Sequence, residues 1–134
     1  MKEQLRDYLP KHGYSVTDCG NVVEDANDNF TDFVLPVVQG VLNNPANRGI
    51  LICGSGIGVS IAANHHQGIR AALVHNVEYA TLARRHNDAN VLCLGGRFVR
   101  LADAIKMVDA FLTTPMDADP KYKHRMNLAD GSVK

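Results

Sequence analysis

The sequence has 134 residues, of which 46% are hydrophobic, and its 14 Lys and Arg residues balance 14 Asp and Glu residues. This length and composition suit one globular domain, 1–134, with a real hydrophobic core. The neutral charge balance excludes the broad positive field that nucleic acid or an anionic membrane would require.

The sequence predicts neither secretion nor membrane insertion. The start, Met1–Asp7, is charged and lacks the apolar core of a signal peptide. The longest apolar stretch, Phe33–Leu42, is interrupted by Pro36 and Gly40 and is too short to span a bilayer. Three cysteines without framework spacing favour a reducing compartment. We therefore expect a cytoplasmic protein.

The first third of the chain mixes helical spacing with a loop rich in acidic residues. Apolar residues separated by three or four positions predict an amphipathic helix at the start, which Gly13 ends. The predicted elements are a helix over Lys2–Lys11, a strand over Tyr14–Cys19, an exposed acidic loop over Gly20–Asn29 and a helix over Thr31–Leu42.

Strands and helices alternate in the rest of the chain. The predicted elements are a strand over Gly49–Cys53, a helix ending near Asn64, a strand over Ile69–Val74, a helix over Asn76–Arg85 with Asn76 as N-cap, a strand over Asn90–Leu94 and a helix over Leu101–Leu112. Such alternation implies right-handed crossovers and a parallel sheet. We predict a three-layer α/β fold, Rossmann-like or flavodoxin-like, with helices on both faces and a short basic tail from about Lys121.

The stretch Gly49–Asn64 reads as a buried strand, a glycine-rich turn and a helix. The glycines at 54, 56 and 58 let backbone N–H groups approach an anion, toward which the helix also directs its positive dipole end. The spacing is neither that of a nucleotide P-loop nor that of the dinucleotide fingerprint. By spacing alone it is weak evidence for phosphate binding, but Cys53 and Ser55 add a thiol and a hydroxyl beside the turn.

Ligands in open α/β sheets bind beyond the carboxyl ends of the strands, where Cys53, His75 and Gly95–Arg97 are expected. At a helix N-terminus the thiolate of Cys53 is stabilised, so this residue could act as a base or a nucleophile. The alternative is a buried cysteine that packs as a small hydrophobe, which we favour for Cys19 and Cys93.

His86 and Asn87 close a predicted helix and precede a strand, which places them at the opposite, amino edge of the sheet. They cannot easily reach Cys53 within one chain. His86 is therefore either a helix C-terminal cap, which the sequence alone favours, or a contribution to the site of a neighbouring subunit.

Four cations are candidates for binding a phosphate, although each lysine is at least as readily explained as a solvated surface residue. They are Arg97, Lys121, Lys123 and Arg125. No Cys and His pair has structural zinc spacing, so we expect no metal site.

Several motifs are specific when taken together: Cys53-Gly-Ser-Gly-Ile-Gly with Ile61-Ala-Ala-Asn64, Gly68-Ile-Arg-Ala-Ala, Leu82-Ala-Arg-Arg-His-Asn-Asp-Ala-Asn-Val-Leu, and Gly95-Gly-Arg. They closely resemble the ribose-5-phosphate isomerase B family, which also includes galactose-6-phosphate isomerase subunits. The similarity extends from the first residues to about Arg125. It implies cofactor-free interconversion of an aldose phosphate and a ketose phosphate through a cis-enediolate. It also implies homodimers or dimers of dimers with active sites shared between chains.

The resemblance also implies roles for individual residues. Cys53 would be the base, and Ser55 would help to move protons between the two substrate oxygens. His86 of a partner chain would assist ring opening, and Asn87 would contact sugar hydroxyls. The enediolate would be held by N–H groups of the turn, at Gly54, Gly56, Ile57 and Gly58, and the phosphate by Arg97 and Arg125.

This chain departs from the family pattern in three places. Family members begin with a strand ending in an Asp-His pair that would precede Met1, so we expect either a longer natural chain or a sheet with fewer strands. Asn29-Phe-Thr-Asp replaces the usual Asp-Tyr-Pro, and Lys121-Tyr122 replaces a frequent Arg-His. Ribose 5-phosphate is the first expected substrate and a tetrose or hexose phosphate the second. The rival interpretations are a catalytically silent or truncated member that acts as a partner subunit, and a phosphosugar-binding module.

Overall fold

The structure is a computed structural model that describes residues 1–131. The elements in chain order are α1 (Lys2–Tyr8), η1 (Leu9–His12), α2 (Thr31–Asn43), β1 (Gly49–Cys53), α3 (Ile57–Asn64), β2 (Ala71–Leu73), α4 (Val77–Arg85), β3 (Val91–Gly95), α5 (Leu101–Thr113) and α6 (Pro120–Ala129). None of these described helices is long and apolar enough to cross a membrane.

The strands form one parallel sheet in the order β1-β3-β2. β3 is the central strand. All five of its residues are buried, as expected of a strand covered on both faces. In register, Val91 lies opposite both Gly49 of β1 and Ala71 of β2. The carboxyl ends of β1 and β3 consequently meet at one edge, where Cys53 pairs with Gly95.

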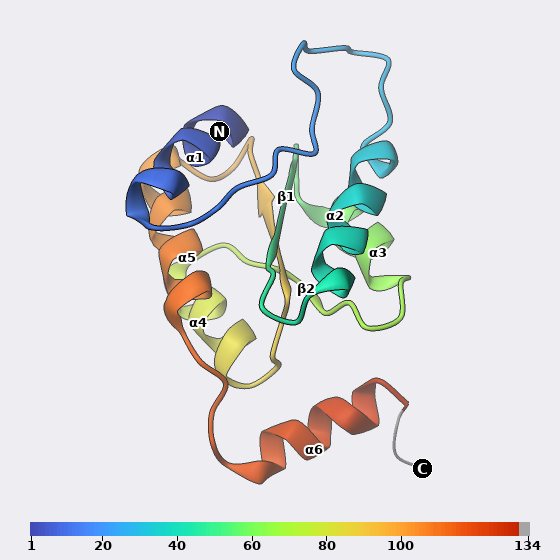
Figure 1. Cartoon of the computed structure of the whole chain (residues 1–134), viewed down its shortest axis with the longest axis vertical. Coiled ribbons are helices and arrows are strands. Elements are labelled where there is room, and N and C mark those ends of the chain that lie inside the picture. Colours follow the sequence, from blue (N-terminus) through green and yellow to red (C-terminus); the bar gives the residue numbers. More distant parts are fainter. Residues whose placement is uncertain (132–134) are drawn as a thin grey trace.

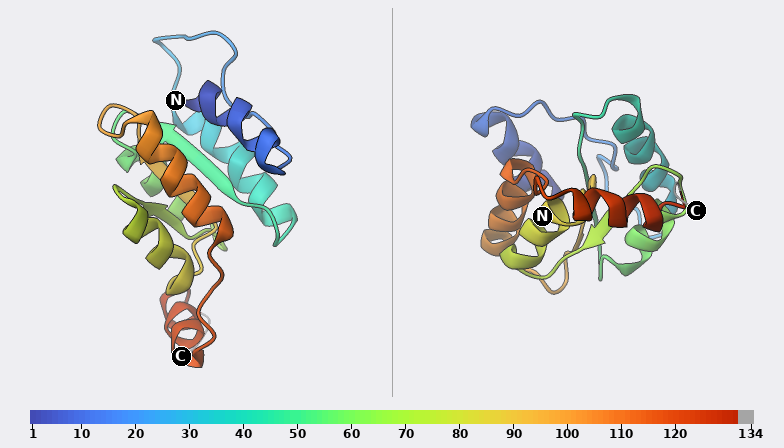
Figure 2. Two further views of the ribbon diagram at one scale, coloured as in Figure 1. Left: turned by 90° about the vertical axis from the view of Figure 1, so that its left-hand side faces the viewer. Right: turned by 90° about the horizontal axis from the view of Figure 1, so that it is seen from below.

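Helices cover both faces of the sheet, so the predicted three-layer α/β fold is confirmed (Figures 1 and 2). Alternate residues of β3 point to opposite layers. Leu92 and Leu94 pack in a cluster with residues of α1, α4 and α5. Val91 and Cys93 pack with residues of α2 and α3.

The strand predicted at Tyr14–Cys19 is wrong, because this segment has no regular secondary structure. It lines a cavity of about 1230 Å³ together with Gly49–Gly54, and among the described residues β1 pairs with β3 alone. An extended segment becomes a strand only when a neighbour pairs with it. Within residues 1–131, β1 is therefore an edge strand with one side open.

Most of the predicted helices agree with the structure to within a few residues. The first divides at Leu9 into α1 and a 3-10 turn, which ends at Gly13 with φ of 89°. Asn76 caps α4 as predicted, since its side chain accepts a hydrogen bond from the Tyr79 N–H. The basic tail forms α6, which has no buried residue.

Candidate functional site

The glycine-rich turn packs directly against the central strand. Gly56 has φ of 79°, a left-handed conformation that favours glycine. A Cβ atom at this position would lie 2.5 Å from Leu73 Cδ1 and 2.9 Å from the Leu94 carbonyl carbon. A Cβ atom on Gly95 would lie 2.6 Å from the Ser55 carbonyl oxygen. The two glycines thus let the turn lie against β3, directly after Cys53.

Cys53 is half-buried at the end of β1 and faces the turn. The Gly56 N–H donates a hydrogen bond of 3.2 Å to the Cys53 sulfur. The Ile57 N–H donates to the Ser55 hydroxyl oxygen, also at 3.2 Å. Cys53 packs against the edge of the core cluster formed with α2 and α3, and its thiol is held beside main-chain donors of the turn.

The N-terminus of α3 offers further donors. The first N–H groups of a helix have no partner within it. For Gly58 and Val59, no hydrogen-bond partner of the N–H is present in the described part of the chain. These groups and the helix dipole form a location suited to negative charge near Cys53.

Arg97 lies against the backbone of the same turn. Its N–H donates to the Gly54 carbonyl oxygen at 3.1 Å. Its guanidinium is so close to Gly54 that an added Cβ would lie 3.0 Å from both Nε and Cζ. No carboxylate pairs with Arg97 among residues 1–131. Its exposed charge thus remains available to an anion beside the thiol.

Phe30 is a neighbour of the turn that the sequence did not identify as part of the site. Its ring lies so close to Gly58 that an added Cβ there would be 2.7 Å from Phe30 Cζ. Phe30, Cys53 and Arg97 all line the cavity of about 1230 Å³ beside β1. The only sequence signal was the departure from the family pattern at Asn29-Phe-Thr-Asp.

His86 and Asn87 lie at the amino edge of the sheet, as the sequence predicted. His86 is the C-cap residue of α4, and its backbone N–H donates to the Leu82 carbonyl oxygen at 2.9 Å. Its imidazole does not cap the helix, but stacks on the Tyr122 ring of α6 with centroids 4.2 Å apart. Asn87 is exposed, and its side-chain amide contacts the Met126 sulfur at 3.6 Å.

Buried Arg84 holds the backbone directly after these two residues. Asp88, in an uncommon left-handed conformation with φ of 45°, accepts a hydrogen bond of 2.9 Å from Arg84. The same guanidinium nitrogen donates to the Ala89 carbonyl oxygen at 2.5 Å, and the guanidinium lies over the Phe111 ring. Arg84 is only 5% exposed, although the sequence gave no sign of a buried cation in α4.

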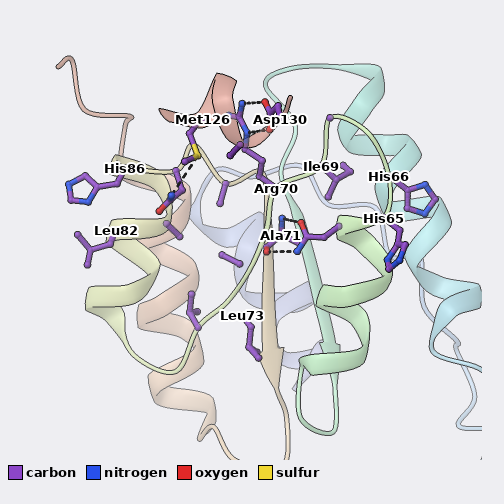
Figure 3. A pocket seen from close by; sticks show the side chains of 18 of the residues that line it. His65, His66, Ile69, Arg70, Ala71, Leu73, Leu82, His86, Met126 and Asp130 are labelled. Atoms are coloured by element: carbon purple, nitrogen blue, oxygen red, sulfur yellow. Dashed lines mark hydrogen bonds and ion pairs between the residues drawn. The ribbon is translucent and has the colours of Figure 1, made fainter. Parts of the chain in front are cut away.

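A second cavity, of about 1020 Å³, lies under α6 at this edge of the sheet (Figure 3). Arg70 and Asp130, which both line this cavity, form an ion pair beside α6. Hydrogen bonds from the Arg70 guanidinium hold the pKa of Asp130 below its ordinary value. His86 lies at the margin of this cavity and points away from the ion pair (Figure 3).

The predicted site residues thus fall into two groups at opposite ends of the sheet. Cys53, Ser55 and the turn amides lie with Arg97 at the carboxyl end, whereas His86 and Asn87 lie with α6 at the amino end. The five residues of β3 separate the groups, a span of about 13 Å or more at roughly 3.3 Å per residue. Arg125, in α6, belongs to the amino-end group, away from Arg97.

Two further candidate residues, Lys121 and Cys93, have ordinary structural roles. Lys121 pairs with Asp119 at 3.1 Å. Cys93 is buried in the central strand, where desolvation raises the pKa of its thiol to about 12. Within the described range, no cluster of three or more His, Cys, Asp or Glu side chains is arranged to hold a metal ion.

A family model described as Ribose/Galactose Isomerase matches residues 1–128. Ribose-5-phosphate isomerase B of Mycolicibacterium paratuberculosis is 38% identical over 128 residues, which are 96% of this chain and 80% of that protein. A ribose 5-phosphate isomerase structure from Thermotoga maritima is 43% identical, with a TM-score of 0.91 and coverage of 96% of this chain and 88% of the other.

A third relative has been solved with a ligand. The ribose-5-phosphate isomerase B structure from Mycoplasma genitalium contains bound ribulose-5-phosphate. It is 39% identical, with a TM-score of 0.92, and the match covers 97% of this chain and 86% of the other. With a family match over almost its entire length and identities well above 30%, the chain belongs to the ribose/galactose isomerase family.

Proposed function

We propose that this chain is a cofactor-independent sugar-phosphate isomerase that interconverts ribose 5-phosphate and ribulose 5-phosphate through a cis-enediolate. The observation that carries the proposal is the Cys53 thiol, which lies beside a turn of main-chain donors and accepts a hydrogen bond from the Gly56 N–H. Family membership supports the reaction class, and the ligand in the Mycoplasma genitalium relative supports the substrate. The three cysteines, all free, support a cytoplasmic location.

The chemistry needs one base and a site for developing negative charge. The Cys53 thiolate removes the proton from C2 of the open-chain aldose, and the C2–H electron pair forms the C1–C2 double bond of an enediolate. The thiol then returns the proton to C1. Ser55 moves a proton between the two oxygens, so that the carbonyl group transfers from C1 to C2. No atom or electron is gained or lost overall.

Main-chain donors stabilise the intermediate. The N–H groups of the turn, from Gly54 to Gly58 with Ile57 included, would hold the enediolate, and the packing of Gly56 on β3 sets the position of the turn. The Gly56 and Ile57 N–H groups donate to the Cys53 sulfur and the Ser55 hydroxyl in this structure, so these two would exchange those hydrogen bonds for bonds to the intermediate. Preorganised donors of this kind, aimed at a developing oxyanion, are typically worth about 3 kcal/mol each. Arg97 supplies positive charge at the same end of the sheet for the substrate phosphate.

A complete site requires a second copy of the chain. We assign ring opening to His86, contacts with sugar hydroxyls to Asn87 and a second phosphate contact to Arg125, all three at the amino end of the sheet. Since these groups cannot reach Cys53 of their own chain, they would act in the site of a partner. A dimer with twofold symmetry, alone or in a dimer of dimers, would form two such sites.

Exposed apolar side chains support an interface near the turn. Ile57 and Ile61, four residues apart on α3, are 53% and 56% exposed, and Phe98, next to Arg97, is 75% exposed. Grouped exposed apolar residues mark interaction surfaces in soluble proteins. A partner seated there would cover them and would bring its own amino-end residues toward Cys53.

A phosphosugar-binding module, or a silent partner subunit, is the second candidate function. It is favoured by one observation, the separation of the two half-sites within a single chain. A chain that did not pair with a competent copy would keep Arg97 and the turn amides, and so would bind a sugar phosphate without converting it. Tight binding with no isomerisation and no proton exchange would identify this function.

Deuterium exchange tests the assignment of the base. In D₂O, the chain incubated with ribose 5-phosphate should incorporate solvent deuterium at the carbon next to the carbonyl, as measured by NMR. Cys53→Ala should abolish the incorporation, whereas Cys19→Ala, a matched substitution of another partly buried cysteine, should leave it intact. Unchanged exchange in Cys53→Ala would remove this residue as the base.

A further inference from the structure

The imidazole of His86 and the ring of Tyr122 form a close, nearly parallel stack. The two rings are stacked with centroids 4.2 Å apart and planes only 4° from parallel. Met126, one turn further along α6, contacts Asn87 at 3.6 Å. Residues four positions apart share one face of a helix, so a single face of α6 covers both His86 and Asn87.

Polar contacts, rather than core burial, hold α6 in this place. No residue of α6 is buried. Asp130 at the far end of the helix is bound by Arg70, and Asp117 in the linker before α6 accepts a hydrogen bond of 3.0 Å from Arg85. The Asp117 N–H also donates to the Arg85 carbonyl oxygen at 2.9 Å. The helix is thus tethered at both ends, with Tyr122 placed over His86.

The Tyr122 ring also lies among cations. Lys121 Nζ is 5.0 Å from its centroid, and Arg125 Cζ is 5.8 Å from it. Arg125 is a proposed phosphate ligand, and His86 is the proposed ring-opening group. The Tyr122 ring therefore lies next to two residues of the proposed site. A stacked ring restricts rotation of the imidazole about its side-chain bonds, which keeps the ring nitrogens in one plane.

We propose that Tyr122 is a positioning residue for His86: it holds the plane of the imidazole for proton transfer to and from the ring oxygen of the cyclic sugar phosphate. This inference rests on the proposed function and deepens it. Misorienting a proton-transfer group by about 1 Å can cost on the order of 100-fold in rate, even when the group itself remains. The stack of Tyr122 on His86 prevents this loss of rate by holding the imidazole in place.

Three substitutions on α6 test the role of Tyr122. Tyr122→Phe keeps the aromatic ring and should retain the wild-type kcat for ribose 5-phosphate. Tyr122→Leu keeps apolar volume and helix propensity but removes the stack, so kcat should fall by about 10- to 100-fold with a smaller change in KM. His124→Leu, the matched control, replaces an exposed ring of the same helix and should leave kcat unchanged.

A second readout separates positioning from general damage. Ribulose 5-phosphate is an open-chain ketose, so exchange of its C1 proton with D₂O needs Cys53 but no ring opening. Tyr122→Leu should therefore keep wild-type exchange at saturating ketose, as should His86→Ala, while both lose conversion of the cyclic aldose. Circular dichroism and sedimentation should report the wild-type fold and oligomeric state.

The possible failures are distinguishable. If wild-type protein neither converts ribose 5-phosphate nor exchanges the ketose proton, the proposed function fails, and the positioning role fails with it. If wild-type protein is active but Tyr122→Leu retains full kcat, or if exchange falls as much as turnover, Tyr122 does not position His86. Loss of activity that accompanies dissociation of the oligomer would likewise overturn the inference, because it would indicate a structural role.

Discussion

Gly56→Ala should destabilise the protein through two separable effects. The first is the left-handed backbone, since φ is 79° at this position, and an alanine there costs about 1–2 kcal/mol. The second is overpacking, because the new Cβ would lie 2.9 Å from the Leu94 backbone carbon, and such crowding in a packed core typically costs about 1–3 kcal/mol. Together they predict that Gly56→Ala lowers the free energy of unfolding by about 2–5 kcal/mol.

Two other glycines provide matched controls. Gly13 also has a left-handed backbone, with φ of 89°, but no heavy atom lies within 4 Å of an added Cβ. Gly13→Ala should therefore lose only the conformational part, about 1–2 kcal/mol. Gly40 lies within α2 with the same open space around it, so Gly40→Ala should gain up to about 1 kcal/mol from helix propensity.

Urea unfolding at one protein concentration measures all three variants. With a slope of about 2 kcal/mol per molar urea, a loss of 3 kcal/mol lowers the midpoint by about 1.5 M. The order predicted from the highest midpoint is Gly40→Ala, wild type, Gly13→Ala and Gly56→Ala. Equal midpoints for Gly13→Ala and Gly56→Ala would refute the tight packing of the turn on β3, and with it the reason that the donors beside Cys53 are fixed.

Three further predictions follow from the open sheet edge, the buried cation and the buried thiol. In β1 the Gly49 N–H and the Cys53 carbonyl oxygen form hydrogen bonds with the β3 side. Because successive residues of a strand alternate sides, the amides of Ile50 and Ile52 point to the open edge and should exchange with D₂O faster than the Leu51 amide. Equal protection of these amides would contradict an open edge. Arg84→Met should lower the free energy of unfolding by about 3 kcal/mol, because it leaves the buried Ala89 carbonyl oxygen unpaired and removes the hydrogen bond to Asp88. Arg85→Met, at an exposed ion pair, should cost much less in the same urea assay. Burial raises the pKa of Cys93 to about 12, so the folded state keeps a proton that the unfolded state releases above its ordinary pKa of about 9. The contribution of Cys93 to the free energy of unfolding is therefore complete below pH 9 and falls by about 1.4 kcal/mol per pH unit between pH 9 and pH 12. Cys93→Val should remove this slope.

The parts of the fold with an internal pattern could be predicted from sequence. The apolar run at Asn90–Leu94 predicted the strand β3, although not its central place in the sheet, and Asn76 was identified as the cap of α4. Tyr14–Cys19 also has a strand-like composition, but a strand needs a neighbour that pairs with it, and composition does not report that β1 pairs with β3 alone among the described residues. Local signals therefore predict single elements more reliably than the contacts between them.

The candidate site shows the same limit. Motif spacing placed Cys53 beside the turn donors and His86 at the opposite edge, and the structure has both residues in these places. The sequence did not indicate that Arg84 is buried, because an arginine in an amphipathic helix is ordinarily a surface residue. The stack of Tyr122 on His86 was equally hidden, since the two residues are far apart in sequence.

The central claim is that each end of the sheet supplies half of an active site and that two chains combine them. Cys53→Ala and His86→Ala should each be inactive toward ribose 5-phosphate alone. When the two variants are unfolded, mixed in equal amounts and refolded together, half of the dimers are hybrids with one intact site each, so about a quarter of wild-type activity should return. If the mixture stays as inactive as the separate variants, the half-sites do not combine between chains and the account is contradicted.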